Sequence, residues 1–289
     1  MTSRYLQPVL DWYAAHARDL PWRAPGASPW SVLVSEVMLQ QTPVARVLPA
    51  YQAWLTRWPE PAALAADPAG EAVRQWGRLG YPRRALWLHQ AARIVTDEHG
   101  GEIPASRAAL LDLPGIGSYT ASAVASFAFG QRHPVLDTNV RRVLCRLVAG
   151  AEFPGRSPSA AEWRLAESLL PAEPGVAARW SVGVMELGAL VCTAARPRCA
   201  SCPLSHHCSW LGAGSPRATA RPAGQRYEGT DRQCRGRLLA VLRGAEGPVA
   251  ASQLEAVWPA LAQRARALDG LVADGLVDAL PDGTYALPA

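Results

Sequence analysis

The chain has 289 residues, of which 49% are hydrophobic and 18% are charged. This length corresponds to about two domains at ~150 residues each, and the composition is typical of a globular protein, not a disordered one. All 29 basic side chains are arginine, because the sequence contains no lysine. A Schiff base through a side-chain amine is therefore excluded, and cationic phosphate contacts must come from guanidinium groups. The net charge of +5 mildly favours an anionic partner.

No apolar run reaches the ~20 residues of a membrane span, because Pro, Gly and Arg interrupt each stretch. The N-terminal segment 1–23 also has no continuous apolar signal core. We therefore expect a cytoplasmic protein without membrane association. In that compartment, cysteines crowded between residues 192 and 208 predict a metal site in preference to disulfides.

Apolar residues at helical spacing predict an almost entirely helical chain up to residue 211. The expected helices span 3–17, 30–41, 43–58, 62–66, 70–79, 83–99, 107–111, 118–129, 138–148, 159–170 and 176–191. Thr42 is expected to cap the third helix, with Pro43 at its first position.

The last part of the chain has a different pattern. A linker rich in Gly, Pro, Ala and Arg is expected at 212–233. Three helices at 235–243, 252–258 and 259–274 follow, and then a hairpin that turns at Asp282-Gly283. This order predicts a small winged-helix-like module. Such modules are typical both of DNA-binding domains and of domains that pack against a partner domain.

Four cysteines form the strongest local motif, with intervals of six, two and five residues: Cys192, Cys199, Cys202 and Cys208. Four thiolates this close together can enclose one tetrahedral metal ion or one iron–sulfur cluster. The spacing alone leaves zinc and iron–sulfur open. A purely structural role is also open beside a role in DNA contact, for which the loop offers Arg196 and Arg198.

A second motif, Pro-Gly-Ile-Gly followed by a helix, lies in the segment Leu113–Gly130. It predicts a helix–hairpin–helix, in which Gly115 and Gly117 permit a tight turn. The free amides at the start of the next helix, from Ser118 on, then form an anion site suited to a DNA phosphate. An ordinary turn between two helices is the alternative.

Two carboxylates stand out. The helical neighbours of Glu36 are mostly apolar, so desolvation is expected to raise its pKa, as suits a general acid. A polar residue at a domain surface is the alternative for Glu36. Asp137 precedes a new helix and is first of all an N-cap, a role that is compatible with that of a fixed anion. Asn139 is the only asparagine in the chain.

These features occur in the order seen in the MutY adenine DNA glycosylases, and the segment Ser-Glu-Val-Met-Leu-Gln-Gln-Thr at 35–42 resembles that subgroup's own motif. The resemblance covers about residues 5–210. It implies the all-α, two-lobed fold of the endonuclease III-like helix–hairpin–helix superfamily. The expected division is an iron–sulfur domain (1–26 and 137–211), a six-helix domain with the hairpin (27–136), the linker (212–233) and the winged-helix-like module (234–289).

The resemblance further implies an enzyme that flips out and hydrolyses adenine mispaired with 8-oxoguanine or guanine in double-stranded DNA. Glu36 would protonate the departing adenine, and Asp137 would stabilise the sugar cation. Asn139 would orient the carboxylate or the water. Tyr119 matches the position at which bifunctional relatives carry their Schiff-base lysine, so a monofunctional glycosylase is expected.

Other positions match the family's substrate contacts. Trp22, Arg23 and Glu186 resemble residues of the pocket for the flipped adenine. Gln41 and Tyr81 resemble the side chains that fill the gap in the duplex.

The resemblance also implies a 4Fe–4S cluster on the four cysteines, a monovalent cation at the helix–hairpin–helix, and a monomer that acts on the bacterial nucleoid. Arg141 and Arg142, beside the catalytic segment, are expected to clamp phosphates together with the arginines of the cysteine loop.

The sequence departs from the family at two places. Pro82 stands where a second tyrosine is common. The segment after Cys208 is too short and too helical for the family's usual Nudix-like reader of 8-oxoguanine. Two alternatives therefore stay open: a mismatch glycosylase for thymine or another base, and a non-enzymatic iron–sulfur DNA-binding regulator.

Overall fold

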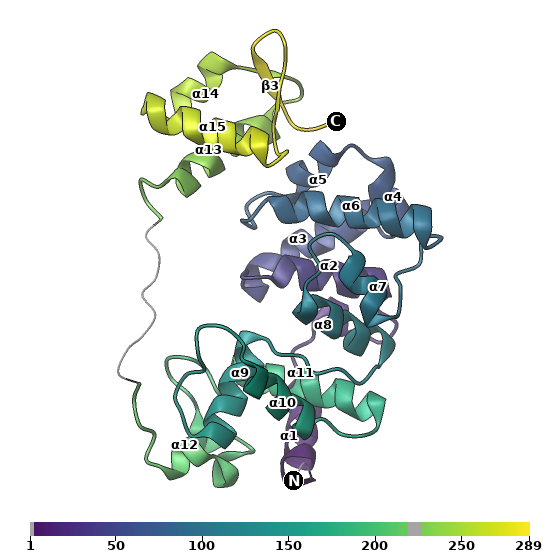
Figure 1. The fold of residues 1–289 in the computed structure, drawn as a ribbon, viewed down its shortest axis with the longest axis vertical. Coiled ribbons are helices and arrows are strands. Elements are labelled where there is room, and N and C mark those ends of the chain that lie inside the picture. Colours follow the sequence, from purple (N-terminus) through teal and green to yellow (C-terminus); the bar gives the residue numbers. More distant parts are fainter. Residues whose placement is uncertain (1–2, 219–226) are drawn as a thin grey trace. The chain divides into compact units, whose positions relative to one another are not determined.

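The structure, a computed structural model, describes residues 3–218 and 227–289 and is helical apart from a small sheet near the C-terminus (Figure 1). This confirms the expected all-α fold. The chain divides into two compact units: Met1–Val32, Ala105–Leu111 and Ile116–Pro222 form the first unit, and Leu33–Pro104, Asp112–Gly115 and Ala223–Ala289 form the second unit. The expected domain boundaries stay a prediction. No helix in the described part of the chain is long and apolar enough to cross a membrane.

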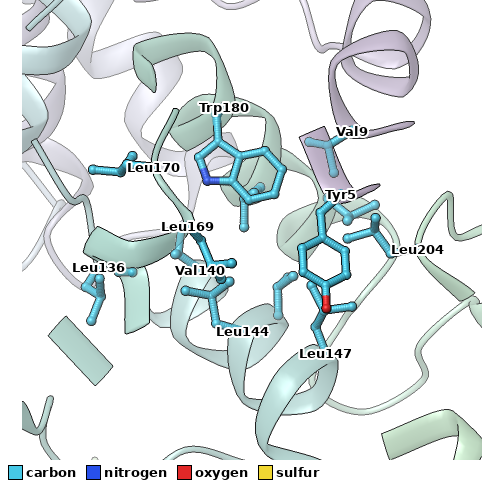
Figure 2. Packing of buried hydrophobic residues seen from close by; sticks show 14 of the residues in the cluster. Tyr5, Val9, Leu136, Val140, Leu144, Leu147, Leu169, Leu170, Trp180 and Leu204 are labelled. Atoms are coloured by element: carbon cyan, nitrogen blue, oxygen red, sulfur yellow. The ribbon is translucent and has the colours of Figure 1, made fainter. Parts of the chain in front are cut away.

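The first unit is built around the long helix α11 (Pro174–Leu190). Its other elements are α1 (Ser3–His16), η1 (Pro21–Arg23), α7 (Arg107–Asp112, whose last residue belongs to the second unit), α8 (Ser118–Phe129), α9 (Thr138–Leu144), the π-helical turn η2 (Cys145–Ala149), α10 (Ala160–Leu169), η3 (Cys199–Ser201), η4 (Ser205–His207) and α12 (Ser209–Gly212). Figure 2 shows the core of this unit, where Trp180 of α11 lies among buried leucines and Val9 of α1. Burial of these side chains holds α1 and α9 against α11, and α10 against α9.

The second unit contains a helical part and a C-terminal module. The helices of the first part are α2 (Pro29–Leu39, which begins in the first unit), α3 (Val44–Arg57), α4 (Pro61–Ala66), α5 (Ala69–Trp76) and α6 (Arg83–Glu98). Three fully buried tryptophans lie at the centre of this helical part. The ring of Trp54 packs edge to face against those of Trp58 and Trp76, at centroid distances of 4.6 and 5.7 Å.

The C-terminal module (residues 231–289) consists of three helices and a three-stranded antiparallel sheet of order β1-β3-β2. Its elements are α13 (Asp231–Gly244), β1 (Val249–Ala250), α14 (Ala251–Val257), α15 (Leu261–Ala273), β2 (Asp278–Ala279) and β3 (Thr284–Ala286). The predicted hairpin is confirmed, with Asp278 paired to Ala286. The sequence did not predict β1, a strand of two residues that pairs with β3. The centre of the expected linker, 219–226, lies outside the described residues.

Two predicted helix starts were wrong. Pro43, not Thr42, is the N-cap of α3, and its side chain makes no capping bond. The Thr42 hydroxyl instead contacts the carbonyl oxygen of Leu79 at 3.4 Å and accepts a hydrogen bond from Arg84. The module's first helix begins at Asp231, because the hydroxyl of Thr230 caps it. The Thr42 hydroxyl, which the local pattern assigned to the cap, instead binds residues distant in the sequence.

Candidate functional site

Glu36 lies in the second half of α2, in the second unit, and is 4% exposed. Its neighbours Val32 and Leu33, one turn earlier, are buried, as are Val37 and Met38 beside it. The predicted apolar surroundings of this carboxyl group are therefore confirmed. A buried carboxyl in such surroundings is suited to donating a proton, although that role stays a prediction.

Asp137, in the first unit, is the N-cap of α9 as predicted. Its Oδ1 accepts a hydrogen bond of 2.6 Å from the backbone N–H of Val140, and its Oδ2 accepts one of 2.7 Å from Nδ2 of Asn139. Burial raises the pKa of Asp137 above its ordinary value, and these hydrogen bonds with the nearby Arg142 offset the rise only in part. The result is a carboxylate fixed in position at a helix N-terminus.

Asn139 is itself held in place by α11, which the sequence did not predict. Its Oδ1 accepts a hydrogen bond of 2.8 Å from Nη2 of Arg142, and the same nitrogen donates to the carbonyl of Gly188 at 2.7 Å. A Cβ at Gly188 would lie 2.7 Å from Cβ of Asn139, so only glycine permits this approach of the two helices. A glycine inside a long predicted helix is the signal that could have identified the position.

The predicted pocket residues Trp22, Arg23 and Glu186 also lie in the first unit. Glu186 is fully buried, and its two oxygens accept hydrogen bonds from Arg23 at 2.8 Å and from Arg18 at 2.7 Å on each oxygen. Burial alone would raise the pKa of Glu186, but the guanidinium groups of Arg18 and Arg23 outweigh it and lower the pKa to about 2. Glu186 thus anchors the η1 turn that carries Trp22 and Arg23. No motif pointed to Arg18.

Gln41 and Tyr81, the predicted gap-filling residues, share an uncommon backbone conformation in the second unit. Their φ angles are 55° and 48°, in the left-handed region that L-residues rarely adopt. The buried Arg84 joins the two loops that carry them. Its guanidinium donates hydrogen bonds to the carbonyls of Val37, Met38, Gln40 and Gly80 and to the hydroxyl of Thr42. Burial lowers the pKa of Arg84 to about 10. No motif pointed to this role of Arg84.

In the helix–hairpin–helix turn, Gly115 has the left-handed backbone that its motif predicts, whereas Gly117 has extended backbone that any residue can adopt. Gly115 has a φ of 74°, and a Cβ there would lie 2.9 Å from the side chain of Trp87. Gly117 is the N-cap of α8, makes no side-chain cap, and has open space around its Cα. The amides from Ser118 on are therefore suited to an anion, while Tyr119 lies half-buried in the first turn of α8. The phosphate contact itself stays a prediction.

The four predicted metal-ligating cysteines line one cavity of about 30 Å³, together with Trp210. Burial, with the neighbouring cysteines as a smaller cause, raises the pKa of Cys202 to about 11, so a bound cation is needed to keep this thiol deprotonated near neutral pH. No three potential ligands in the described residues converge on the position of a single ion. As a donor set, four cysteine thiols around one cavity would fit an iron–sulfur cluster. Arg146, 1% exposed, donates to Sγ of Cys192 at 3.3 Å.

The prediction that Arg141 and Arg142 clamp phosphates was wrong. Arg141 is 7% exposed and forms an ion pair with Glu162 at 2.7 Å. Arg142 is 9% exposed and donates to the carbonyl of Cys192 at 2.7 Å, besides its bonds to Asn139. Both guanidinium groups are therefore used inside the protein. The prediction for Arg196 and Arg198, which are exposed, stays open.

Comparisons with known proteins show the family of the chain. Residues 34–168 match the family described as HhH-GPD superfamily base excision DNA repair protein. An adenine DNA glycosylase of Mycolicibacterium smegmatis is 52% identical over 280 residues, which cover 96% of this chain and 94% of that protein. A thermostable thymine-DNA glycosylase superposes with a TM-score of 0.67 at 30% identity, covering 73% of this chain and 97% of its own. A trapped endonuclease III–DNA covalent intermediate gives 0.62 at 25% identity, covering 74% and 97%.

Proposed function

Because this chain belongs to the adenine DNA glycosylases of the helix–hairpin–helix superfamily, we propose that it removes adenine mispaired with 8-oxoguanine or guanine from double-stranded DNA. The observation that carries the proposal is a pair of carboxyl groups in different settings. Glu36 is buried among apolar side chains, whereas Asp137 is held by amides at a helix N-terminus. Bond cleavage that expels a purine needs an acid for the base and an anion for the sugar, and these settings suit the two tasks.

In the proposed reaction the adenine first leaves the stack, which costs a few kcal/mol. Glu36 then donates its proton to a ring nitrogen of the departing base. Asp137 stabilises the oxocarbenium-like sugar by its charge, and Asn139 keeps that carboxylate aimed. Water completes the hydrolysis. Tyr119 supplies no amine and the chain contains no lysine, so the enzyme is monofunctional.

The remaining predicted residues bind substrate. Trp22 and Arg23 line the pocket for the flipped adenine and are held there by Glu186. Gln41 and Tyr81 occupy the gap left in the duplex. The amides after Gly115 and Gly117, from Ser118 on, bind a backbone phosphate, with a monovalent cation at the turn.

The four cysteines of the cavity in the first unit would hold a 4Fe–4S cluster. When bound, the cluster supplies four metal–thiolate bonds that cross-link the segment 192–208. We infer a monomer that works on chromosomal DNA in the cytoplasm.

A base-release assay tests this proposal. Duplexes carry A opposite 8-oxoguanine, G, C or T, and a further set carries T opposite G. We expect adenine release opposite 8-oxoguanine and G, and a loss of about 10²–10⁴-fold in Glu36→Gln, the range for a general acid. Glu98→Gln, an exposed carboxylate at the end of α6, is the matched control.

Two outcomes would contradict the proposal. Release of thymine but not adenine would identify a mismatch glycosylase of different specificity. Sequence-specific binding without release of any base would identify a DNA-binding regulator.

A further inference from the structure

The C-terminal module is held on α5 by two arginines that cap each other's helices. Arg74 of α5 donates from Nη1 to the carbonyls of Leu242 and Ala245 at the end of α13, at 3.5 and 2.8 Å. Arg243 of α13 donates from Nε to the carbonyl of Val73, near the end of α5, at 2.8 Å. Each cation thus lies at the carbonyl end of the other helix, where a positive charge is stabilising.

A second contact holds the other end of the module on the same helix. The N–H of Gly70 donates to the carbonyl of Pro288 at 2.7 Å. A Cβ at Gly70 would lie 2.8 Å from Cβ of Leu287, so the contact depends on glycine. With both of its ends in contact with α5, the module is a docked part of the second unit.

Docking in this position places Arg232, in the first turn of α13, between two tyrosines. Its Cζ lies 5.2 Å from the ring centroid of Tyr81, in the turn before α6, and 5.6 Å from that of Tyr227, just before the module. We call these three side chains the stacking platform. They come from parts of the sequence that only the docked module brings together.

Both tyrosines of the platform face solvent. Tyr81 is 45% exposed and Tyr227 is 51% exposed, and they are the only aromatic residues among the exposed large hydrophobic side chains of the described residues. Tyr81 also holds a left-handed backbone, with a φ of 48°. Strained backbone of this kind gathers at binding sites, and an exposed cation–π contact stabilises a fold only weakly. These features indicate a ligand that the platform binds.

Aromatic faces and guanidinium planes stack on nucleobases of any sequence, and the positive charge attracts the phosphate backbone. We propose that Tyr81, Arg232 and Tyr227 stack on a nucleobase that borders the gap left by the flipped adenine, so that the C-terminal module takes part in recognising the substrate. This inference rests on the proposed function, because its ligand is the mispaired DNA of that reaction.

Binding of wild-type protein and variants to a duplex that resists hydrolysis tests the inference. The duplex carries a 2′-fluoro-2′-deoxyadenosine opposite 8-oxoguanine, and a fully paired duplex serves for comparison. Arg232→Ala and Tyr227→Leu should each lose about 5- to 100-fold in affinity for the mispair, the range for one lost base–aromatic stack. Tyr227→Phe keeps the ring and should bind as the wild type does.

Arg237→Ala is the matched control. Arg237 is also exposed, lies on the same helix, and stacks on Trp258 at 5.5 Å, inside the module. Arg237→Ala should weaken binding to both duplexes by the same factor, and this factor should be smaller than the loss in Arg232→Ala. Equal losses in Arg232→Ala and Arg237→Ala, or unchanged binding in Tyr227→Leu, would overturn the platform.

Adenine release by the wild-type protein, measured in parallel, separates the two proposals. The wild type could release adenine while the platform variants bind both duplexes as Arg237→Ala does. That result would refute the stacking platform but not the proposed function. If the wild type neither releases adenine nor prefers the mispaired duplex, both proposals fail.

Discussion

The surroundings of Glu186 and Asp137, both in the first unit, move the pKa of a carboxyl group in opposite directions. Glu186 is fully buried and accepts hydrogen bonds from the guanidinium groups of Arg18 and Arg23, which outweigh its burial and lower its pKa to about 2. Asp137 is half-buried, its oxygens accept from neutral amides, and desolvation raises its pKa. The sign of the shift follows the charge of the donors.

This difference indicates what each carboxylate is available to do. The charge of Glu186 is already balanced by the two guanidinium groups that it binds. Glu186 therefore fixes the η1 turn, and its net electrostatic effect on a substrate is small. The neutral donors of Asp137 fix its position without cancelling its charge. A developing cation nearby can therefore be stabilised by Asp137, as the proposed reaction requires.

The largest expected effect is on stability, in Glu186→Gln. Removing this charge leaves two guanidinium groups without their buried partner, and breaking such a pair is expected to cost about 3–5 kcal/mol. Urea unfolding measures it. Glu167→Gln, which removes the exposed partner of Arg132, is the control and should change the free energy of unfolding by less than about 1 kcal/mol. A small effect in Glu186→Gln would show that the arginines find other partners.

Asp137→Asn should reduce the rate of adenine release by about 10²–10³-fold, the range for loss of one preorganised electrostatic group. Asp137→Asn keeps the cap bond from Val140 but loses the bond that Asn139 donates, because an amide NH2 cannot accept it, whereas Asp137→Ala should lose the cap as well, about 1 kcal/mol in addition. Single-turnover kinetics and urea unfolding measure the two effects separately.

Glu173→Gln is the control for Asp137, because Glu173 is also an N-cap carboxylate of the first unit, on α11. It should alter stability without altering the rate. A wild-type rate in Asp137→Asn would show that the cap, and not the charge, is the function of Asp137.

The sequence predicted the Asp137 surroundings but not those of Glu186, for a physical reason. A cap is a local interaction, so an aspartate before a helix predicts it, and most helix bounds follow from periodicity in the same way. The bond from Arg18 to Glu186 joins residues far apart in the chain, and nothing local encodes it. The same reason explains the wrong predictions for Thr42 and Arg142, whose partners lie on other elements.

A smaller effect is expected for Gly188→Ala, which tests whether Asn139 positions Asp137. The new Cβ would lie 2.7 Å from Cβ of Asn139, and overpacking of this kind costs about 1–3 kcal/mol. The shift of Asn139 should slow adenine release about 10-fold, the order of a disturbed hydrogen bond of ~1.4 kcal/mol. Gly244→Ala, at the open end of α13, is the control and should leave the rate unchanged. Loss of stability at an unchanged rate would remove Asn139 from the mechanism.

The smallest expected effect is the pH dependence of stability, in which the two carboxylates again have opposite signs. The contribution of Glu186 is fully present above its unfolded pKa of 4.5 and is lost as the pH falls towards about 2. The contribution of Asp137 is present below its ordinary pKa of 3.8 and is lost as the pH rises through its raised folded pKa.

Urea unfolding of the wild type and Asp137→Asn at about pH 4 and about pH 7 measures this effect, because only the wild type contains the carboxyl group whose pKa is raised. The wild type should therefore lose stability relative to Asp137→Asn at the higher pH. A difference that does not change with pH would show that the Asp137 carboxylate is as well stabilised in the folded chain as in water, and its contrast with Glu186 would then be one of partners and not of pKa.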